Sequence, residues 1–170
     1  KMDLSANKKL KVLRYRNTKV SKMISVPNPS AIEELDCSET KISSLDLRKY
    51  TALKHLNASQ TKITSLNVQN CHELVTVYVR GTTKLSKLDL SNQAKLRDVI
   101  FGDSGIKELD VRNSLLICDQ DDLGSGFDFM PGFKISCKII VNKNCSEIVQ
   151  GDKTGDTPLS EMLKAWLKEK

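Results

Sequence analysis

The chain has 170 residues, which suits one domain with a hydrophobic core. Aromatic residues make up only 5% of it, which favours thin layers of aliphatic side chains over a globular core built on rings. No apolar run approaches the roughly 18 residues of a transmembrane helix, and no signal peptide opens the sequence. The net charge of +6 suits an anionic partner and equally an ordinary solubility device, so charge alone selects no function.

The first residues form part of a repeat. "MDLSANKKL" at 2–10 aligns with "LDLSNQAKL" at 88–96, so Met2 and Leu4 take the places of Leu88 and Leu90. A repeat array needs a polar cap at each end, and the residue before Met2 cannot supply one. We therefore expect Lys1 to mark an artificial or processing boundary within a longer precursor.

Five matched units follow, and each opens with one recurring line. The lines read "LKVLRYRNTKV", "IEELDCSETKI", "LKHLNASQTKI", "LVTVYVRGTTKL" and "LRDVIFGDSGI". Their first residues are Leu10, Ile32, Leu53, Leu74 and Leu96, so successive spacings are 22, 21, 21 and 22 residues. The spacing slips only in the fourth unit, where Thr82 and Thr83 stand for one Thr elsewhere. Self-similarity at this period predicts a solenoid.

Each unit is expected to contain two short strands. The pattern LxxLxL points the fourth and sixth residues to one side, because side chains alternate along a strand. The sixth column consists of residue types that can be buried, namely Tyr15, Cys37, Ala58, Val79 and Phe101. The second half of each unit repeats the pattern, with Leu45 and Leu47, Leu66 and Val68, Leu88 and Leu90, and Leu109 and Val111. Tight corners join the two stretches, and few residues remain for helix.

A hydroxyl column marks the corner after the first strand. We place Thr18, Thr40, Thr61, Thr83 and Ser104 in this ninth column. A hydroxyl can donate and accept, and the turn must satisfy buried backbone groups. Stacked every ~4.8 Å, these residues are expected to bond to neighbouring coils as a ladder.

These features resemble the leucine-rich-repeat family over residues 2–112. The period with two strands per coil is similar to that of bacterial members, the internalins and the BspA-like surface proteins of Bacteroidetes. The resemblance implies a right-handed, β-rich α/β solenoid of five coils of parallel strands, in a bacterial cell-surface or secreted protein. The family usually has Asn at the ladder column, where this chain has Thr or Ser, so close kinship to internalins is not implied.

The repeat pattern ends after Val111, and we assign residues 1–114 to the solenoid. Residues 115–170 are expected to form a C-terminal cap in the same structural unit, with a strand at about 133–141 in "FKISCKIIV". A helix is predicted at about 158–169, where Thr157 is a suitable N-cap and Pro158 the first helical residue. Its apolar face is Leu159, Met162, Leu163, Trp166 and Leu167. We interpret this face as closing the end of the solenoid, and binding of a partner helix as the alternative.

The outward residues of the first strands form the candidate binding surface. Positions 3, 5 and 7 are Val12, Arg14 and Arg16; Glu34, Asp36 and Ser38; His55, Asn57 and Ser59; Thr76, Tyr78 and Arg80; and Asp98, Ile100 and Gly102. The resemblance implies that this sheet is the concave, partner-binding face. Since Tyr and Arg are enriched in interface hot spots, the candidate contacts are Arg14, Asp36, His55, Asn57, Tyr78, Arg80 and Ile100. The alternative is an ordinary surface with scattered apolar residues. Five strands span only ~24 Å, which fits a peptide, a glycan or one edge of a protein.

Two charged columns run beside the strands. The first is Lys19, Lys41, Lys62 and Lys84, with Gly105 ending the series, and we interpret it as a solvated rim, with a polyanion site as the alternative. The second, Asp46, Asn67, Asp89 and Asp110, is a candidate source of compensating charge. It lacks the Gly-spaced loops of cation ladders. No nucleic-acid partner is expected, because aromatic residues are not interleaved with the basic ones.

The cysteines and histidines do not suggest a catalytic or metal site. The five cysteines show no CxxC pair, and no His pair has ligand spacing, so neither a metal nor a cofactor is expected. Cys118, Cys137 and Cys145 are the plausible local disulfide set, with 137 to 145 as one pairing. Cys71 precedes His72, but sequence neighbours rarely face each other as a catalytic pair must. The sequence has no phosphate loop or nucleophile elbow, so we do not expect an enzyme.

The leading hypothesis is therefore a non-catalytic module that binds a protein or glycan through the first-strand sheet. The alternative is a structural spacer within a larger surface protein. We expect a monomer, and end-to-end pairing through the open end coils is the alternative.

Overall fold

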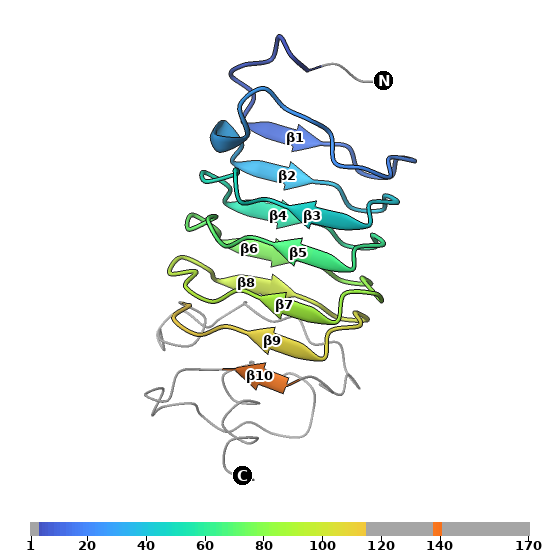
Figure 1. Cartoon of the computed structure of the whole chain (residues 1–170), viewed down its shortest axis with the longest axis vertical. Helices are drawn as coiled ribbons and strands as arrows, with labels where there is room; N and C mark the ends of the chain where they lie inside the picture. Colours follow the sequence, from blue (N-terminus) through green and yellow to red (C-terminus); the bar gives the residue numbers. More distant parts are fainter. Residues whose placement is uncertain (1–3, 115–137, 141–170) are drawn as a thin grey trace.

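A computed structural model describes residues 4–114 and 138–140 as a stack of short strands on two sides of the chain (Figure 1). The first sheet has the order β1-β2-β4-β6-β8, and every pair in it is parallel. Its strands are β1 (Val12–Arg14), β2 (Glu34–Asp36), β4 (His55–Asn57), β6 (Thr76–Tyr78) and β8 (Asp98–Ile100). This arrangement confirms the predicted leucine-rich-repeat solenoid.

The second side carries the strands of the second half-units, which run opposite to those of the first sheet (Figure 1). Hydrogen bonds join β3 to β5 and order the others as β10-β9-β7. These strands are β3 (Ser44–Asp46), β5 (Ser65–Asn67), β7 (Lys87–Asp89), β9 (Glu108–Asp110) and β10 (Lys138–Ile140). The described residues contain a single helical turn, the 3-10 helix η1 (Pro29–Ala31), and no helix long and apolar enough to cross a membrane.

The core is a continuous layer of aliphatic side chains between the two sides. The central residue of each first-sheet strand lies in register with the next, as Leu35 with Leu56 and Leu56 with Val77. The sixth column is buried as predicted, with exposed fractions of 5% for Tyr15, 0% for Cys37, Ala58 and Val79, and 4% for Phe101. Because side chains alternate, the same register that buries this set turns the flanking residues outward.

The first corner differs from the prediction in two ways. The buried hydroxyl of the fourth coil is Thr82, whereas Thr83 is exposed, so the inserted residue is Thr83. The threonine hydroxyls also bond within their own coil and not to a neighbouring one. Each donates to the carbonyl three residues earlier, at 2.6–2.8 Å, as seen for Thr18, Thr40, Thr61 and Thr82. The residue before each of these four threonines has a positive φ of 53–67°, at Asn17, Glu39, Gln60 and Gly81. This left-handed turn points the next hydroxyl back at its own strand.

The inserted Thr83 also explains Gly105. A Cβ atom on Gly105 would lie 2.2 Å from the carbonyl oxygen of Thr83 and 2.8 Å from its carbonyl carbon. The extra residue of the fourth coil therefore occupies the space that a side chain of the fifth coil would need. This is why the lysine column stops at Lys84.

Two buried side chains at the second corner do bond to the backbone of a neighbouring coil. The thiol of Cys71 donates to the carbonyl of Leu47 at 3.2 Å, and Nε2 of Gln93 donates to that of Val68 at 3.3 Å. Both carbonyls belong to the preceding coil, so the expected ladder lies on the other side of the solenoid. The partial first repeat forms the same corner, since the amide of Leu10 donates to the carbonyl of Asn7 as Leu96 donates to Gln93.

Only part of the predicted C-terminal cap lies within the described residues. Within the expected strand at about 133–141, residues 138–140 form β10, which pairs with β9 in parallel and places Ile139 opposite Leu109. The strand therefore adds one rung to the second side in the register of the repeat. The helix expected at about 158–169 and the cysteines at 118, 137 and 145 lie outside the described residues.

Candidate functional site

The structure gathers six of the seven predicted contact residues onto two neighbouring rows of the first sheet. One row consists of residues that are cross-strand partners in successive coils, Arg14, Asp36, Asn57, Tyr78 and Ile100. The adjacent row includes His55 beside Thr76. Arg80 lies beyond the end of β6, two residues after Tyr78. Register alone produces this arrangement, because a spacing of one coil returns each position to the same place on the sheet.

The apolar part of the row lies at β6 and β8. Tyr78 and Ile100 are direct cross-strand partners, and both are half-buried. Aromatic and β-branched residues that face each other in this way form a favourable cross-strand pair. Val12, at the opposite end of the sheet, is the exposed large hydrophobic residue of the described chain, at 44%. The half-buried pair therefore offers apolar area that a ligand can cover further, and Arg80 follows Tyr78 by two residues in the chain.

Ion pairs between coils engage the charged residues of the face. Arg14 makes a two-pronged contact with Glu34, with Nε 2.5 Å from Oε1 and Nη2 2.8 Å from Oε2. This hydrogen bond lowers the pKa of the Glu34 carboxyl. Nη2 of Arg80 lies 3.2 Å from Oδ2 of Asp103 in the next coil. The neighbouring row is also joined, since Nδ1 of His55 lies 3.1 Å from the hydroxyl oxygen of Thr76. A ligand on this face would meet side chains that are already oriented.

Asp36 and Asn57 also hold the turn that follows each strand. Oδ1 of Asp36 accepts the amide of Ser38 at 2.9 Å and its hydroxyl at 2.6 Å. Oδ1 of Asn57 accepts the amide of Ser59 at 3.1 Å. Ser38 is only 3% exposed, so its placement among the outward residues was wrong, because its hydroxyl turns back to Asp36. Asp36 and Asn57 have a structural task besides their place in the row.

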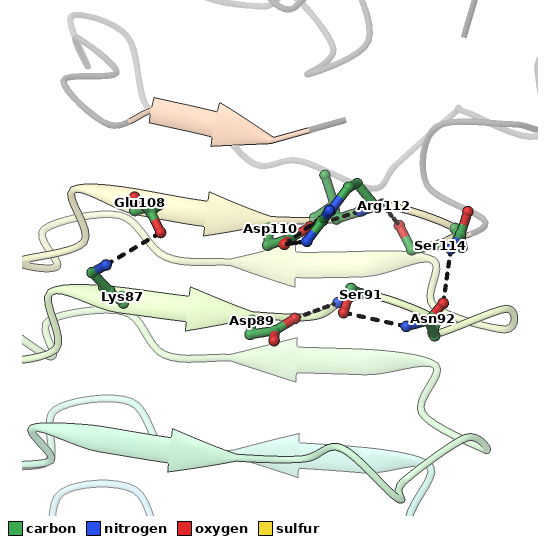
Figure 2. Close-up of polar contacts among 10 residues, drawn as sticks. Lys87, Asp89, Ser91, Asn92, Glu108, Asp110, Arg112 and Ser114 are labelled. Atoms are coloured by element: carbon green, nitrogen blue, oxygen red, sulfur yellow. Dashed lines mark hydrogen bonds and ion pairs between the residues drawn. The ribbon is translucent and has the colours of Figure 1, made fainter. Parts of the chain in front are cut away.

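The same turn recurs along the second side (Figure 2). Oδ1 of Asp46, Asn67, Asp89 and Asp110 accepts the amide two residues later, at 2.9–3.2 Å. Where that residue is arginine, as in Arg48 and Arg112, the guanidinium also binds the carboxylate. The bond from Arg48 holds the pKa of Asp46 at about 2. These carboxylates therefore bind local groups, and none of their described contacts is with the lysine column.

The lysine column lies at the first corner. Lys19, Lys41, Lys62 and Lys84 are all exposed. Between the first coils is an open depression of about 620 Å³, lined by Asn17, Thr18, Lys19, Glu39, Thr40, Lys41 and Gln60. Other described lysines contact acidic residues of adjacent coils, as when Lys11 and Lys54 both lie 2.7 Å from Glu33. The hydrogen bonds from these two lysines lower the pKa of Glu33 to about 2.

The described cysteines are buried parts of the core. Burial raises the pKa of the Cys71 thiol to about 12, so it is protonated at neutral pH, while His72 is exposed. Cys37 is equally buried, and its pKa is also raised to about 12. Within residues 4–114 and 138–140, no three His, Cys, Asp or Glu side chains are grouped to hold a metal ion. Chemistry based on a thiolate would have to ionise a thiol that is already desolvated in the core.

Comparison with known proteins supports the fold. No family model matches the chain, and neither does any curated protein. A solved structure of the functional domain of InlJ from Listeria monocytogenes, described as including a cysteine ladder, has 21% sequence identity and a TM-score of 0.52. The match covers 89% of this chain but only 29% of that one. In this chain, Cys37 and Cys71 occupy different columns of the repeat, so the described residues form no such ladder.

Proposed function

We propose that this chain is a non-catalytic binding module of a bacterial cell-surface or secreted protein, and that it holds a protein or glycan on the outer face of the first sheet. The observation that carries the proposal is the half-buried pair of Tyr78 and Ile100 next to Arg80. Aromatic and arginine side chains that can become fully desolvated supply most of the energy at interfaces.

The sheet itself favours recognition over catalysis. Its five strands present side chains at fixed intervals on a surface whose polar groups are oriented by bonds between coils, such as Arg14 with Glu34. Such preorganisation lowers the entropy lost when a ligand binds. The likeness to the InlJ domain is compatible with this proposal, at the level of fold.

The test is binding of the parent chain to host matrix proteins and to a glycan array, followed by titration of each hit with variants. Tyr78→Ala and Arg80→Ala are expected to weaken binding by about tenfold or more, the range of hot-spot residues. Val12→Ala is the matched control, because it removes a comparably placed exposed side chain from the far end of the same sheet. Circular dichroism melts establish that each variant is folded. Equal affinities for the parent, Tyr78→Ala and Arg80→Ala would refute this choice of face.

A structural spacer is the second candidate, and one observation favours it. Charged residues of the face are engaged in joining one coil to the next, as in the pair of Arg14 with Glu34. A spacer would present other domains of a longer protein and bind nothing on its own. It predicts that the isolated chain shows no saturable binding to the matrix proteins or to the glycan array. It also predicts that mechanical or thermal stability falls when the ion pairs between coils are removed.

A further inference from the structure

The lysine column is built into the fold by the backbone. The amide of Lys41 donates to the carbonyl of Val20 at 2.8 Å, and that of Lys62 to the carbonyl of Ile42 at 3.0 Å. Lys41 and Lys62 thus leave their coils at the same point, one rung apart. Stacked strands are ~4.8 Å apart, so the column sets its cations at about this interval along the solenoid axis.

The charges of the lysine column are close enough together to repel one another in water. Two unit charges in water repel with an energy equal to RT at about 7 Å, which exceeds the ~4.8 Å between rungs. A linear polyanion carries condensed counterions, and a row of lysines that neutralises its charges releases them, which favours binding through entropy. The charge is greatest at the N-terminal end, because residues 4–32 contain seven Lys and Arg and no Asp or Glu.

The acidic residues of the same corner already form ion pairs with arginines. Glu39 and Asp103 belong to the column of positive-φ residues just before the lysines. Oε1 of Glu39 lies 2.7 Å from Nη2 of Arg16, and Asp103 pairs with Arg80. Both acidic residues are directed at arginines that follow the first-sheet strands. The described ion pairs therefore do not neutralise the lysine column.

The surroundings of the column suit a carbohydrate. The depression beside Lys19 and Lys41 is lined by residues with amide or hydroxyl groups, Asn17, Thr18, Thr40 and Gln60, and by Glu39, whose carboxylate pairs with Arg16. On the other side, Ser43 and Thr64 are exposed. Amides and hydroxyls can both donate to and accept from sugar hydroxyls. No aromatic side chain lines this depression, so it offers no platform on which nucleobases could stack.

We infer that Lys19, Lys41, Lys62 and Lys84 form a binding site for a linear sulfated polysaccharide that lies along the solenoid axis and crosses successive coils. The lysines bind the sulfates, and the flanking amides and hydroxyls contact the sugar. This site is separate from the first-sheet face, so it stands or falls independently of the function proposed above.

The test compares two variants with the same net charge. The column variant carries Lys19→Ser, Lys41→Ser, Lys62→Ser and Lys84→Ser. The control carries the same change at four described lysines that form ion pairs, Lys11, Lys54, Lys87 and Lys95. Affinity for heparin is measured by isothermal titration calorimetry across a salt series, and circular dichroism confirms that both variants are folded.

We expect the column variant to bind heparin at least tenfold more weakly than the parent. The slope of log K against log salt concentration should become shallower by up to about one unit for each lysine removed. The control is expected to stay within about threefold of the parent, and chemically desulfated heparin should not bind. Equal losses in the two variants would refute the site, because only net charge would then matter. A DNA duplex that binds as tightly as heparin and depends equally on the column would refute the choice of a sulfated glycan. Tyr78→Ala should leave heparin affinity unchanged.

Discussion

Gly105→Ala tests how the extra residue of the fourth coil is accommodated. The added Cβ atom would lie 2.2 Å from the carbonyl oxygen of Thr83, whereas carbon and oxygen normally stay more than about 3 Å apart. The obstacle is backbone, which cannot swing aside as a flexible side chain could. The two coils must therefore separate by nearly 1 Å at this corner, where the amide of Gly105 donates to the carbonyl of Thr82.

The expected cost follows from competing effects. Overpacking of a tightly fitted site typically costs about 1–3 kcal/mol. Alanine recovers about 0.4–1 kcal/mol where the native backbone accepts it, because the unfolded chain becomes less flexible. Since Gly105 does not have a positive φ, this gain applies to it. At the midpoints of the two ranges the steric cost exceeds the gain, and the free energy of unfolding should fall by about 1.3 kcal/mol.

Urea unfolding followed by circular dichroism measures the change, and Gly102→Ala is the matched control. Gly102 belongs to the same coil, and its added Cβ would meet nothing within 4 Å. We expect Gly102→Ala to be neutral or slightly stabilising. Deleting Thr83 in the Gly105→Ala background should recover most of the lost stability, because the obstructing carbonyl is removed. If Gly105→Ala and Gly102→Ala unfold at the same urea concentration, the clash with Thr83 is not the reason for the glycine.

Three further predictions test the corners and the ion pairs. Thr82→Val should lower the free energy of unfolding by about 0.5–1.5 kcal/mol, because the carbonyl of Val79 loses its hydroxyl donor and keeps only the amide of Thr82, at 3.4 Å. Thr83→Val should change it by less than about 0.5 kcal/mol in the same urea experiment, and the reverse order would contradict the assigned register. Peptide mapping after brief alkylation should find Cys71 unmodified in the native protein and modified in urea, because its thiol is buried with a pKa of about 12, and rapid native labelling would contradict this. Carbon-13 NMR should show the Glu33 carboxyl titrating near pH 2, and Lys54→Met should raise the midpoint toward 4.5. The ion pair of Glu33 with Lys54 therefore stabilises the fold fully above about pH 4.5 and loses this effect as the pH falls toward 2. An unchanged midpoint in the variant would count against the ion pair.

The strands and core could be predicted from the sequence because every coil repeats the same alternation. A residue such as Leu56 has an apolar equivalent one period before and after it, and parallel stacking converts that periodicity directly into register. The first corner could also have been placed correctly. Counting from Leu74 as the first residue of the unit makes Thr82 the ninth, and Gly81 before it supplies the residue most tolerant of a left-handed turn.

Contacts between coils were harder to predict. The sequence showed that Arg14 and Glu34 both face outward, but their pairing depends on side-chain reach across the strand register. The bonds of Cys71 and Gln93 to the preceding coil were missed because this column carries unlike residues and has no repeated letter to mark it. The turns that use Asp36 had a local signal, an acidic residue two positions before Ser38, which sequence reasoning passed over.

The distribution of these contacts separates two surfaces that share one backbone. Bonds between coils hold the side chains of the first-sheet face, so a ligand there meets a rigid surface and gains chiefly from covering Tyr78 and Ile100. At the first corner the acidic residues turn away toward arginines, so a polyanion bound to the lysine column gains chiefly from the release of its own counterions. Salt should therefore weaken binding at the column far more than binding at the sheet. Substitutions on the two surfaces should also be nearly additive, because the first-sheet strands and the first corner are different parts of each coil.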